Sequence, residues 1–198
     1  MSASKLRLFT AVDIPEEIRE VISGAVQNLK EEVEGARWVK LQNLHLTLKF
    51  IGNFEEERLE RLIQEIHTVA ERSTRFTAAL GGCGAFPSTK KARIVWIGMA
   101  NGGDEAGIIA RKIDKRLERL GVEREDRPFR SHLTLARLKQ PRDCSGQLEN
   151  LDRKLKGLPE MTFVVGEVTL YQSCLGPQGP TYNPLRHLSL GGGVGWEW

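Results

Sequence analysis

The 198-residue sequence contains few cysteines and no long apolar stretch. Its three cysteines, Cys83, Cys144 and Cys174, are odd in number and widely spaced, which argues against a disulfide framework and a cysteine-rich zinc site. No run approaches the ~20 apolar residues of a membrane span, and residues 1–9 carry charge but lack an apolar stretch of signal-peptide length. These absences predict a cytoplasmic protein with no membrane attachment.

A strong charge of either sign is also missing. The chain has 29 Lys and Arg against 26 Asp and Glu, a net charge of +3. That excess is too small to indicate nucleic-acid binding, so any attraction for RNA must come from the local placement of arginine. Hydrophobic residues make up 40% of the chain, which is enough to build a folded core and argues against disorder.

Strand-like and helix-like segments occur in two roughly equal halves. Alternating or β-rich patterns predict strands at 44–51, 92–99 and 130–138, and 3.6-residue periodicity predicts helices at 55–72 and 104–120. The segment 81–91 is expected to be a loop. The sequence therefore predicts an α+β fold, with residues 1–198 forming one bilobal domain built by internal duplication. Each lobe is expected to hold an antiparallel sheet with flanking helices, and Trp196 and Trp198 are candidate anchors for the glycine-rich tail.

The same tetrapeptide, His-Leu-Thr-Leu, occurs once in each half, at residues 45–48 and 132–135. From the composition, about 0.2 cases of threonine two positions after histidine are expected by chance. A single copy is best interpreted as a solvated strand face, whereas two copies in matching halves favour a functional site. His67 and His187 have no such threonine and are expected to be structural or surface residues.

Strand geometry places residues i and i+2 on one face, about 6.5–7 Å apart. Each motif therefore presents an imidazole and a hydroxyl side by side, away from the core. If a pseudo-twofold axis relates the halves, both pairs line one cleft. Strict alternation assigns Leu44, Leu46, Leu48 and Phe50 to the core, with Leu133 and Leu135 in the second copy, and assigns His45, Thr47, Lys49, His132, Thr134 and Ala136 to the opposite face.

Two imidazoles and two hydroxyls suit cleavage of a phosphodiester by general acid–base catalysis. The unperturbed pKa of imidazole, near 6.5, makes a proton acceptor and a proton donor available together near neutral pH. Each threonine hydroxyl can donate to a non-bridging phosphate oxygen, worth about 2–4 kcal/mol in the transition state if it acts like other oxyanion donors. No metal-ligand motif is evident, so we expect no metal or cofactor and an already activated ester as substrate.

The sequence resembles the two-histidine (2H) phosphoesterase superfamily, which is marked by two His-x-Thr-x motifs. Within it, the chain is similar to the RNA 2′,3′-cyclic phosphodiesterases, historically called 2′–5′ RNA ligases. The similarity covers nearly the whole chain. Besides the two motifs near residues 43–50 and 130–137, it includes Arg7-Leu8-Phe9-Thr10-Ala11-Val12-Asp13-Ile14-Pro15, Arg93 to Gly98, Arg127-Pro128-Phe129, Leu170-Tyr171-Gln172-Ser173 and Gly179-Pro180-Thr181-Tyr182.

The resemblance implies a bilobal fold and metal-independent hydrolysis of RNA 2′,3′-cyclic phosphate ends to 2′-phosphomonoesters. It assigns His45 as proton donor, His132 as proton acceptor, and Thr47 and Thr134 as phosphate-binding residues. The motifs alone are too symmetric to decide which histidine is the acid. RNA ends or small cyclic nucleotides are the expected partners, the protein is expected to be a monomer, and the reverse reaction with a 5′-hydroxyl would give 2′–5′ ligation.

Two further residues are candidates for substrate binding, Arg137 by resemblance and Phe9 as an aromatic stacking partner. Strict alternation would put Arg137 on the core face, so the strand must end or bulge before it. A different class of function stays open, a non-catalytic nucleotide- or RNA-binding module on the same fold. The intact acid–base pair argues against it, because pure binding needs no such pair.

Overall fold

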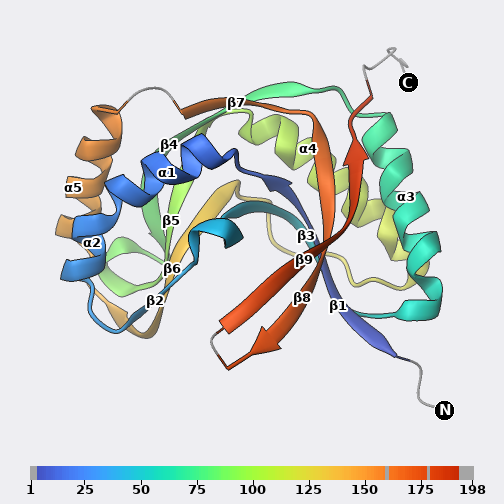
Figure 1. Cartoon of the computed structure of the whole chain (residues 1–198), viewed down its shortest axis with the longest axis horizontal. Coiled ribbons are helices and arrows are strands. Elements are labelled where there is room, and N and C mark those ends of the chain that lie inside the picture. The colour runs from blue at the N-terminus through green and yellow to red at the C-terminus, as the bar shows by residue number, and fades with distance from the viewer. Residues whose placement is uncertain (1–3, 159–160, 178, 192–198) are drawn as a thin grey trace.

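The computed structural model describes residues 4–158, 161–177 and 179–191, so Trp196 and Trp198 lie outside the described ranges. A single curled antiparallel sheet carries helices on its outer side (Figure 1). Its strands are β1 (Lys5–Asp13), β2 (Ala36–Trp38), β3 (His45–Glu55), β4 (Phe76–Phe86), β5 (Ala92–Asn101), β6 (His132–Arg142), β7 (Met161–Val165), β8 (Glu167–Gly176) and β9 (Gly179–Ser189). The helices are α1 (Glu16–Ala25), α2 (Gln27–Glu32), α3 (Leu59–Glu71), α4 (Gly103–Leu117) and α5 (Ser145–Lys156).

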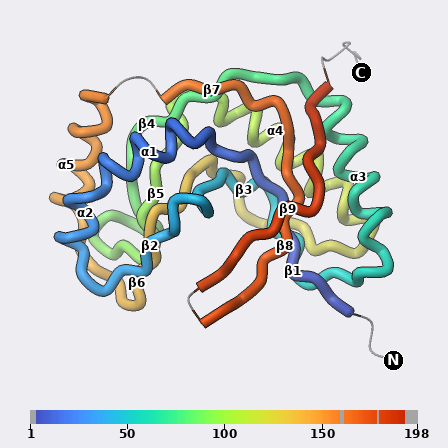
Figure 2. Tube along the Cα trace, in the orientation of Figure 1, coloured from blue at the N-terminus to red at the C-terminus, as the bar shows by residue number. Residues whose placement is uncertain are grey.

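The strand order β7-β4-β5-β6-β3-β1-β8-β9 divides the sheet into two lobes, with β2 added beside β6. We call β1, β3, β8 and β9 the first lobe and β4 to β7 with β2 the second. The lobes do not coincide with the two halves of the chain, because β8 and β9 return to pair with β1. Helix α3 packs on β8 and β9, whereas α1 and α2 lie against α5, which packs on β4. Figure 2 shows how β8 and β9, near the end of the chain, return to lie beside β1. The predicted bilobal α+β class is confirmed.

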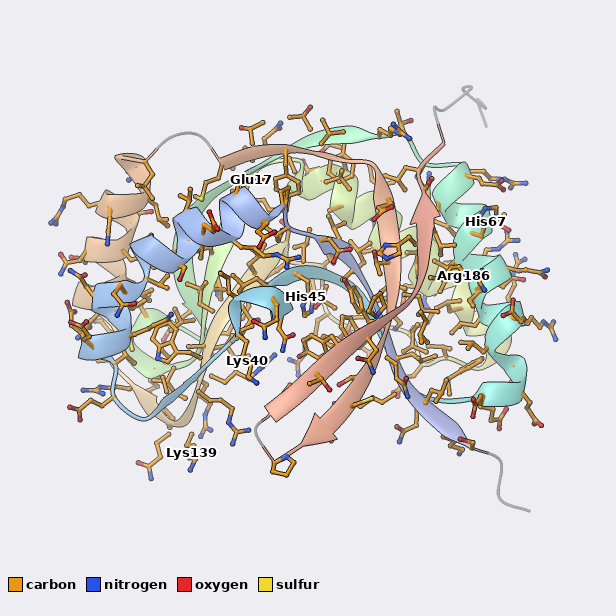
Figure 3. The ribbon with its side chains drawn as sticks, in the orientation of Figure 1. Glu17, Lys40, His45, His67, Lys139 and Arg186 are labelled. Atoms are coloured by element: carbon orange, nitrogen blue, oxygen red, sulfur yellow. The ribbon has the colours of Figure 1, made fainter. Side chains whose placement is uncertain are left out.

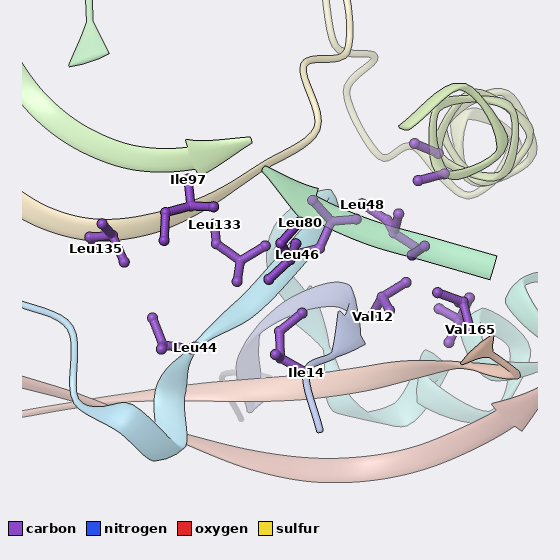
Figure 4. Packing of buried hydrophobic residues seen from close by; sticks show 14 of the residues in the cluster. Val12, Ile14, Leu44, Leu46, Leu48, Leu80, Ile97, Leu133, Leu135 and Val165 are labelled. Carbon is purple, nitrogen blue, oxygen red and sulfur yellow. The ribbon is translucent and has the colours of Figure 1, made fainter. Parts of the chain in front are cut away.

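The strands of the two lobes pair at one position, the joint, between the two sequence motifs. Leu46 of β3 pairs with Leu133 of β6. Their side chains are 1% and 0% exposed and belong to the continuous apolar core, shown from close by in Figure 4. The joint therefore places both copies of His-x-Thr at the centre of the sheet, on the face opposite these leucines.

A β-bulge follows each motif and changes which side chains face the core. In β3, Ala11 pairs with Thr47 and Thr10 with Lys49, which leaves Leu48 as the extra residue. In β6, Leu135 is the extra residue by the same pattern, between Thr134 and Ala136. An extra residue shifts the alternation by one position, so the side chains after it exchange faces.

Three expectations from strict alternation are therefore wrong. Lys49 is buried at 5% exposure, and its Nζ lies 2.7 Å from Oδ1 of Asp114 on α4. Ala136 is fully buried, and Phe50 is 58% exposed rather than part of the core. The expected bulge before Arg137 is confirmed, and this side chain is exposed on the face of the histidines.

The predicted loop at 81–91 is also wrong in its first half, because β4 continues to Phe86. The two glycines 81 and 82 interrupt the pairing with β5, and Gly82 has a φ of 67°, a backbone conformation that glycine adopts without steric cost. A glycine pair normally indicates a break, but here it marks an irregularity inside a strand. No described helix is long and apolar enough to cross a membrane.

Candidate active site

Both motif histidines are held in the same way by the backbone. Nδ1 of His45 lies 2.7 Å from the carbonyl oxygen of Asn43, and Nδ1 of His132 lies 2.7 Å from that of Arg130. A carbonyl oxygen can only accept, so Nδ1 carries the proton and donates it in each ring. This contact fixes the tautomer and leaves Nε2 as the atom that can accept or release a proton toward a substrate.

The register at the joint indicates which residues of the two motifs face each other. Continuing the Leu46–Leu133 pair by one residue on either side places His45 opposite Thr134 and Thr47 opposite His132. In sheet geometry the two histidines are then diagonal neighbours, about 7–8 Å apart at Cα. All four side chains are half-buried. The arrangement can place one phosphate between two imidazoles and two hydroxyls.

Aromatic rings surround each imidazole. The ring of His45 lies 4.9 Å from that of Phe9 and 5.2 Å, edge to face, from that of Tyr182. The ring of His132 lies 5.0 Å, edge to face, from that of Phe86 and 6.4 Å from that of Trp96. These contacts restrict ring rotation and exclude part of the solvent from each histidine.

Burial lowers the pKa of both His45 and His132 below the usual value of 6.5. The backbone carbonyls raise both pKa values, and the positive charge of Arg137 lowers both. Asp13 raises the pKa of His45 and is absent from the groups that act on His132. The two sites are therefore alike in form but different in electrostatics.

Arg137 and Phe50 occupy equivalent places after the two bulges. Arg137 lies across from Ile94 of β5, and Phe50 lies across from Phe9 of β1. Both side chains are exposed on the side of the histidines. An aromatic ring and a guanidinium are thus presented on opposite sides of the joint, and each is a flat surface on which a base can stack.

Phe9 does not share this exposure. It is 3% exposed and stacks on Tyr171 at 5.2 Å, with His45 and Tyr182 also near its ring. Phe9 therefore packs behind His45 and offers little surface to a base. Of the residues selected from the sequence, the structure brings His45, Thr47, His132, Thr134 and Arg137 to one face.

A polar cluster lies next to His45 on the first lobe. Asp13 accepts hydrogen bonds from the hydroxyls of Thr169, at 2.7 Å, and Tyr171. Nδ1 of His187 lies 3.0 Å from a carboxylate oxygen of Glu167. One ligand atom each from Asp13, Glu167 and His187 lies within 4.8 Å of the others, so these three are the described residues that could approach a metal ion. Their atoms already pair with one another and with the hydroxyls, which is the arrangement of a hydrogen-bonded network.

The sequence analysis missed Asp13, Tyr171, Tyr182 and Phe50 as contributors to this site. All four stand in segments that carry the family resemblance, but no pattern in the sequence joins β1, β8 and β9 to His45. His67 is exposed on α3, 3.5 Å from Glu71, as expected for a surface residue. In Figure 3, His45 lies near the middle of the molecule and His67 lies at its edge.

Comparison with known proteins shows the family to which the chain belongs. The family model described as LigT like phosphoesterase matches the chain twice, over residues 12–96 and 97–182. An RNA 2′,3′-cyclic phosphodiesterase of Archaeoglobus fulgidus is 35% identical over 181 residues, 91% of this chain and 98% of that protein. The structure of TT0787 of Thermus thermophilus is similar with a TM-score of 0.78 and 30% identity, covering 96% of this chain and 100% of the other. The structure of E. coli LigT complexed with 3′-AMP has a TM-score of 0.75 and 30% identity, covering 94% and 99%.

Two lobes that each bring one histidine and one threonine to a common face define a two-histidine phosphoesterase. The two matches of the family model divide between residues 96 and 97, so each contains one motif. The chain belongs to the LigT-like phosphoesterase family, and the resemblance drawn from its sequence is confirmed.

Proposed function

We propose that this protein hydrolyses RNA 2′,3′-cyclic phosphate ends to 2′-phosphomonoesters without a metal ion. The observation that carries the proposal is the matched pair of histidines, each fixed through Nδ1 and each followed two residues later on its strand by a half-buried threonine. The names of its relatives support the substrate class, because the proteins of Archaeoglobus fulgidus and Thermus thermophilus are RNA 2′,3′-cyclic phosphodiesterases.

In the proposed reaction His132 acts as the base. Its neutral Nε2 removes a proton from water, and the water oxygen attacks the phosphorus atom of the cyclic ester. His45 acts as the acid. Its protonated Nε2 gives a proton to the 3′ oxygen as the bond between that oxygen and phosphorus breaks, and the phosphate stays on the 2′ oxygen. Solvent then restores the proton on His45 and removes the one on His132.

Thr47 and Thr134 bind the reacting phosphate in this proposal. Each hydroxyl donates to a non-bridging oxygen, where negative charge increases in the transition state. Arg137, whose charge acts on both histidines, adds a positive group near the same phosphate. Strain in the five-membered ring supplies the activation that a metal would otherwise provide. A cyclic ester of this kind needs two cis hydroxyls on the sugar, which restricts the substrate to ribonucleotides.

The terminal base is proposed to stack on Phe50. Phe50 is 58% exposed although it is a large apolar side chain, and it follows Thr47 along β3 beyond the bulge, on the same face. Stacking on an aromatic ring accepts every base, since each has a π face. The complex of E. coli LigT with 3′-AMP supports nucleotide binding by this fold.

The test is turnover of a short oligonucleotide with a defined 2′,3′-cyclic phosphate end, in EDTA, with the product identified by mass and mobility. We expect a 2′-phosphate product and a bell-shaped dependence of rate on pH. His45→Ala and His132→Ala should each lower kcat by about 10²–10⁴-fold, whereas the matched control His67→Ala should not. Near-normal activity in either motif variant would disprove the mechanism.

Ligation is the reverse of the same chemistry, with the 5′-hydroxyl of a second RNA in place of water. Purified protein given both RNA ends should form linked and hydrolysed products in a ratio that measures how much ligation it supports. A non-catalytic binding module is the competing function. It would be indicated by RNA binding that persists in a His45→Ala, His132→Ala double variant together with no turnover by the wild type.

We propose that the active unit is a monomer in the cytoplasm. One chain supplies both histidines and both threonines, so the site needs no second copy. The three cysteines are free thiols, the state that a reducing compartment maintains. Sedimentation of the active protein would test the monomer, and an obligate dimer would contradict it.

A further inference from the structure

One position distinguishes the surroundings of the two histidines. Across the antiparallel pair of β1 and β3, His45 stands directly opposite Asp13. Across the equivalent pair of β5 and β6, His132 stands directly opposite Gly98. Directly opposite residues have side chains on one face, with Cβ atoms about 4.5–5.5 Å apart. His45 therefore has a carboxylate beside it, and His132 has no side chain at that place.

The carboxylate of Asp13 is held in place from the neighbouring strand. Thr169, which is fully buried, donates its hydroxyl to Oδ2 at 2.7 Å, and the hydroxyl of Tyr171 donates to Oδ1. Two donated hydrogen bonds suit an ionised carboxylate, which can only accept. The equivalent positions of the second lobe, by their pairing with β5, are Gly84 and Phe86, which carry no hydroxyl.

We infer that Asp13 is a positioning residue that favours the protonated form of His45 over that of His132 and so makes His45, rather than His132, the acid. This inference rests on the proposed function for its catalytic consequence. A negative charge beside an imidazole favours the imidazolium, and a protonated ring is what the leaving oxygen requires. His132, with no carboxylate opposite it, lacks this stabilisation of the imidazolium and is the better proton acceptor of the two.

The other groups around His45 do not provide this selectivity. Arg19 of α1 and Arg137 of β6 both lower the pKa of His45, as burial does, and Asn43 raises it through its carbonyl. Tyr171 of β8 and Tyr182 of β9 are held as neutral phenols, because burial raises the pKa of each. His187 and Glu167 lie within 4.8 Å of Asp13 and pair with each other, and neither is among the groups that act on His45. Asp13 is the group among these that favours the charged ring by its own charge.

The first experiment measures the two rings directly and needs no turnover. NMR titration should show a lower pKa for His45 in Asp13→Asn than in the wild type, by about one unit, and an unchanged pKa for His132. The matched control is Asp126→Asn, which removes an exposed carboxylate. Equal titration of His45 with and without the Asp13 carboxylate would overturn the inference even if the enzyme hydrolyses RNA ends as proposed.

The second experiment uses the leaving group. Asp13→Asn should lower kcat about tenfold on the alkaline side of the rate profile, where the acid loses its proton, and little on the acidic side. A cyclic substrate with sulfur in place of the 3′ oxygen needs little proton donation, so Asp13→Asn and His45→Ala should recover most of their loss on it and His132→Ala should not. Recovery by His132→Ala instead would reverse the assignment. Absence of wild-type turnover would disprove the proposed function and leave the NMR result to decide the role of Asp13.

Tyr171→Phe tests whether the position of the Asp13 carboxylate matters in addition to its charge. It removes the donor to Asp13 but keeps the ring that stacks on Phe9. If Asp13 acts through its fixed position, this variant should share the leaving-group recovery of Asp13→Asn with a smaller loss, about threefold. A loss that is equal for oxygen and sulfur leaving groups would show a purely structural role for this contact.

Discussion

Leu46 and Leu133 pair with each other at the joint of the two lobes, and each stands between the histidine and the threonine of its own motif. The two leucines thus pack in the core on one face of the sheet. Their pairing also sets the distance between the histidines and threonines on the other face. Movement at this joint changes the distance between the two imidazoles, so packing and catalysis depend on it together.

Leu133→Ala should lower the free energy of unfolding by about 2–5 kcal/mol, because it leaves a cavity among fully buried side chains. It should also reduce activity by altering the spacing across the joint. Urea denaturation gives the stability, and the matched control is Leu175→Ala, since Leu175 is 73% exposed. Wild-type stability for Leu133→Ala would contradict the packing described for the joint.

Replacing either motif threonine by valine keeps the shape of the side chain and removes the hydroxyl. Thr47→Val and Thr134→Val should each reduce kcat by about 10²-fold, with a smaller effect on KM, because the hydroxyl is proposed to bind charge that forms in the transition state. Thr162→Val, at an exposed site on β7, serves as the control. A rise in KM with unchanged kcat would indicate ground-state binding only.

Lys49 and Asp114 form a buried ion pair that ties the bulge of β3 to α4. Asp114 also accepts the backbone N–H of Glu125 at 3.0 Å. Lys49→Met should destabilise the protein by about 3–5 kcal/mol, because it leaves a buried carboxylate without its main partner. The double variant Lys49→Met, Asp114→Leu should regain part of that loss in denaturant titrations. Equal loss in the single and double variants would argue against a charge effect.

The free energy of unfolding should depend on pH through the two histidines. Burial lowers the pKa of both below 6.5 in the folded state. The unfolded chain therefore binds more protons just below pH 6.5, so the folded state is fully stabilised above that value and loses stability as pH falls through the folded-state pKa values. Thermal unfolding as a function of pH would show a weaker slope in the His45→Ala, His132→Ala double variant. An unchanged slope would assign the effect to other groups.

Phe50→Ala should raise KM for a cyclic-phosphate oligonucleotide by about tenfold with little change in kcat, as expected for the loss of one stacking contact. Stability should change little, since the ring is more than half exposed. Phe50→Trp, which keeps an aromatic surface, should retain a low KM. A loss confined to kcat would place Phe50 outside base binding.

The sequence sufficed for the fold class, and local periodicity sufficed to put the histidine and threonine of each motif on one face. His45 and Thr47 share a face by strand geometry alone, and the duplicate at residues 132–135 repeats it. The prediction of which side chains face the core was wrong where a bulge interrupts the regular alternation of a strand. Each bulge inserts one residue, and this is why strict alternation puts Lys49 on the wrong face and Phe50 in the core.

Contacts between distant segments could not be predicted from the sequence. Asp13, Thr169 and Tyr171 meet because β1 pairs with both β3 and β8, and that strand order is set by packing across the whole chain. The sequence could not distinguish acid from base for the same reason. The inferred difference lies in the residue opposite each histidine, Asp13 or Gly98, and no local pattern identifies these two positions as equivalent.

The return of β8 and β9 to the first lobe has a consequence for how such a site could arise. Two separate copies of a half-length chain, assembled around a twofold axis, would give both histidines identical neighbours and identical proton affinity. A single polypeptide that contains both copies is free of this constraint, and a substitution opposite one histidine no longer appears opposite the other. Because both copies belong to one chain, the two histidines can have different neighbours and different proton affinities. Two identical chains related by a twofold axis could not provide this difference.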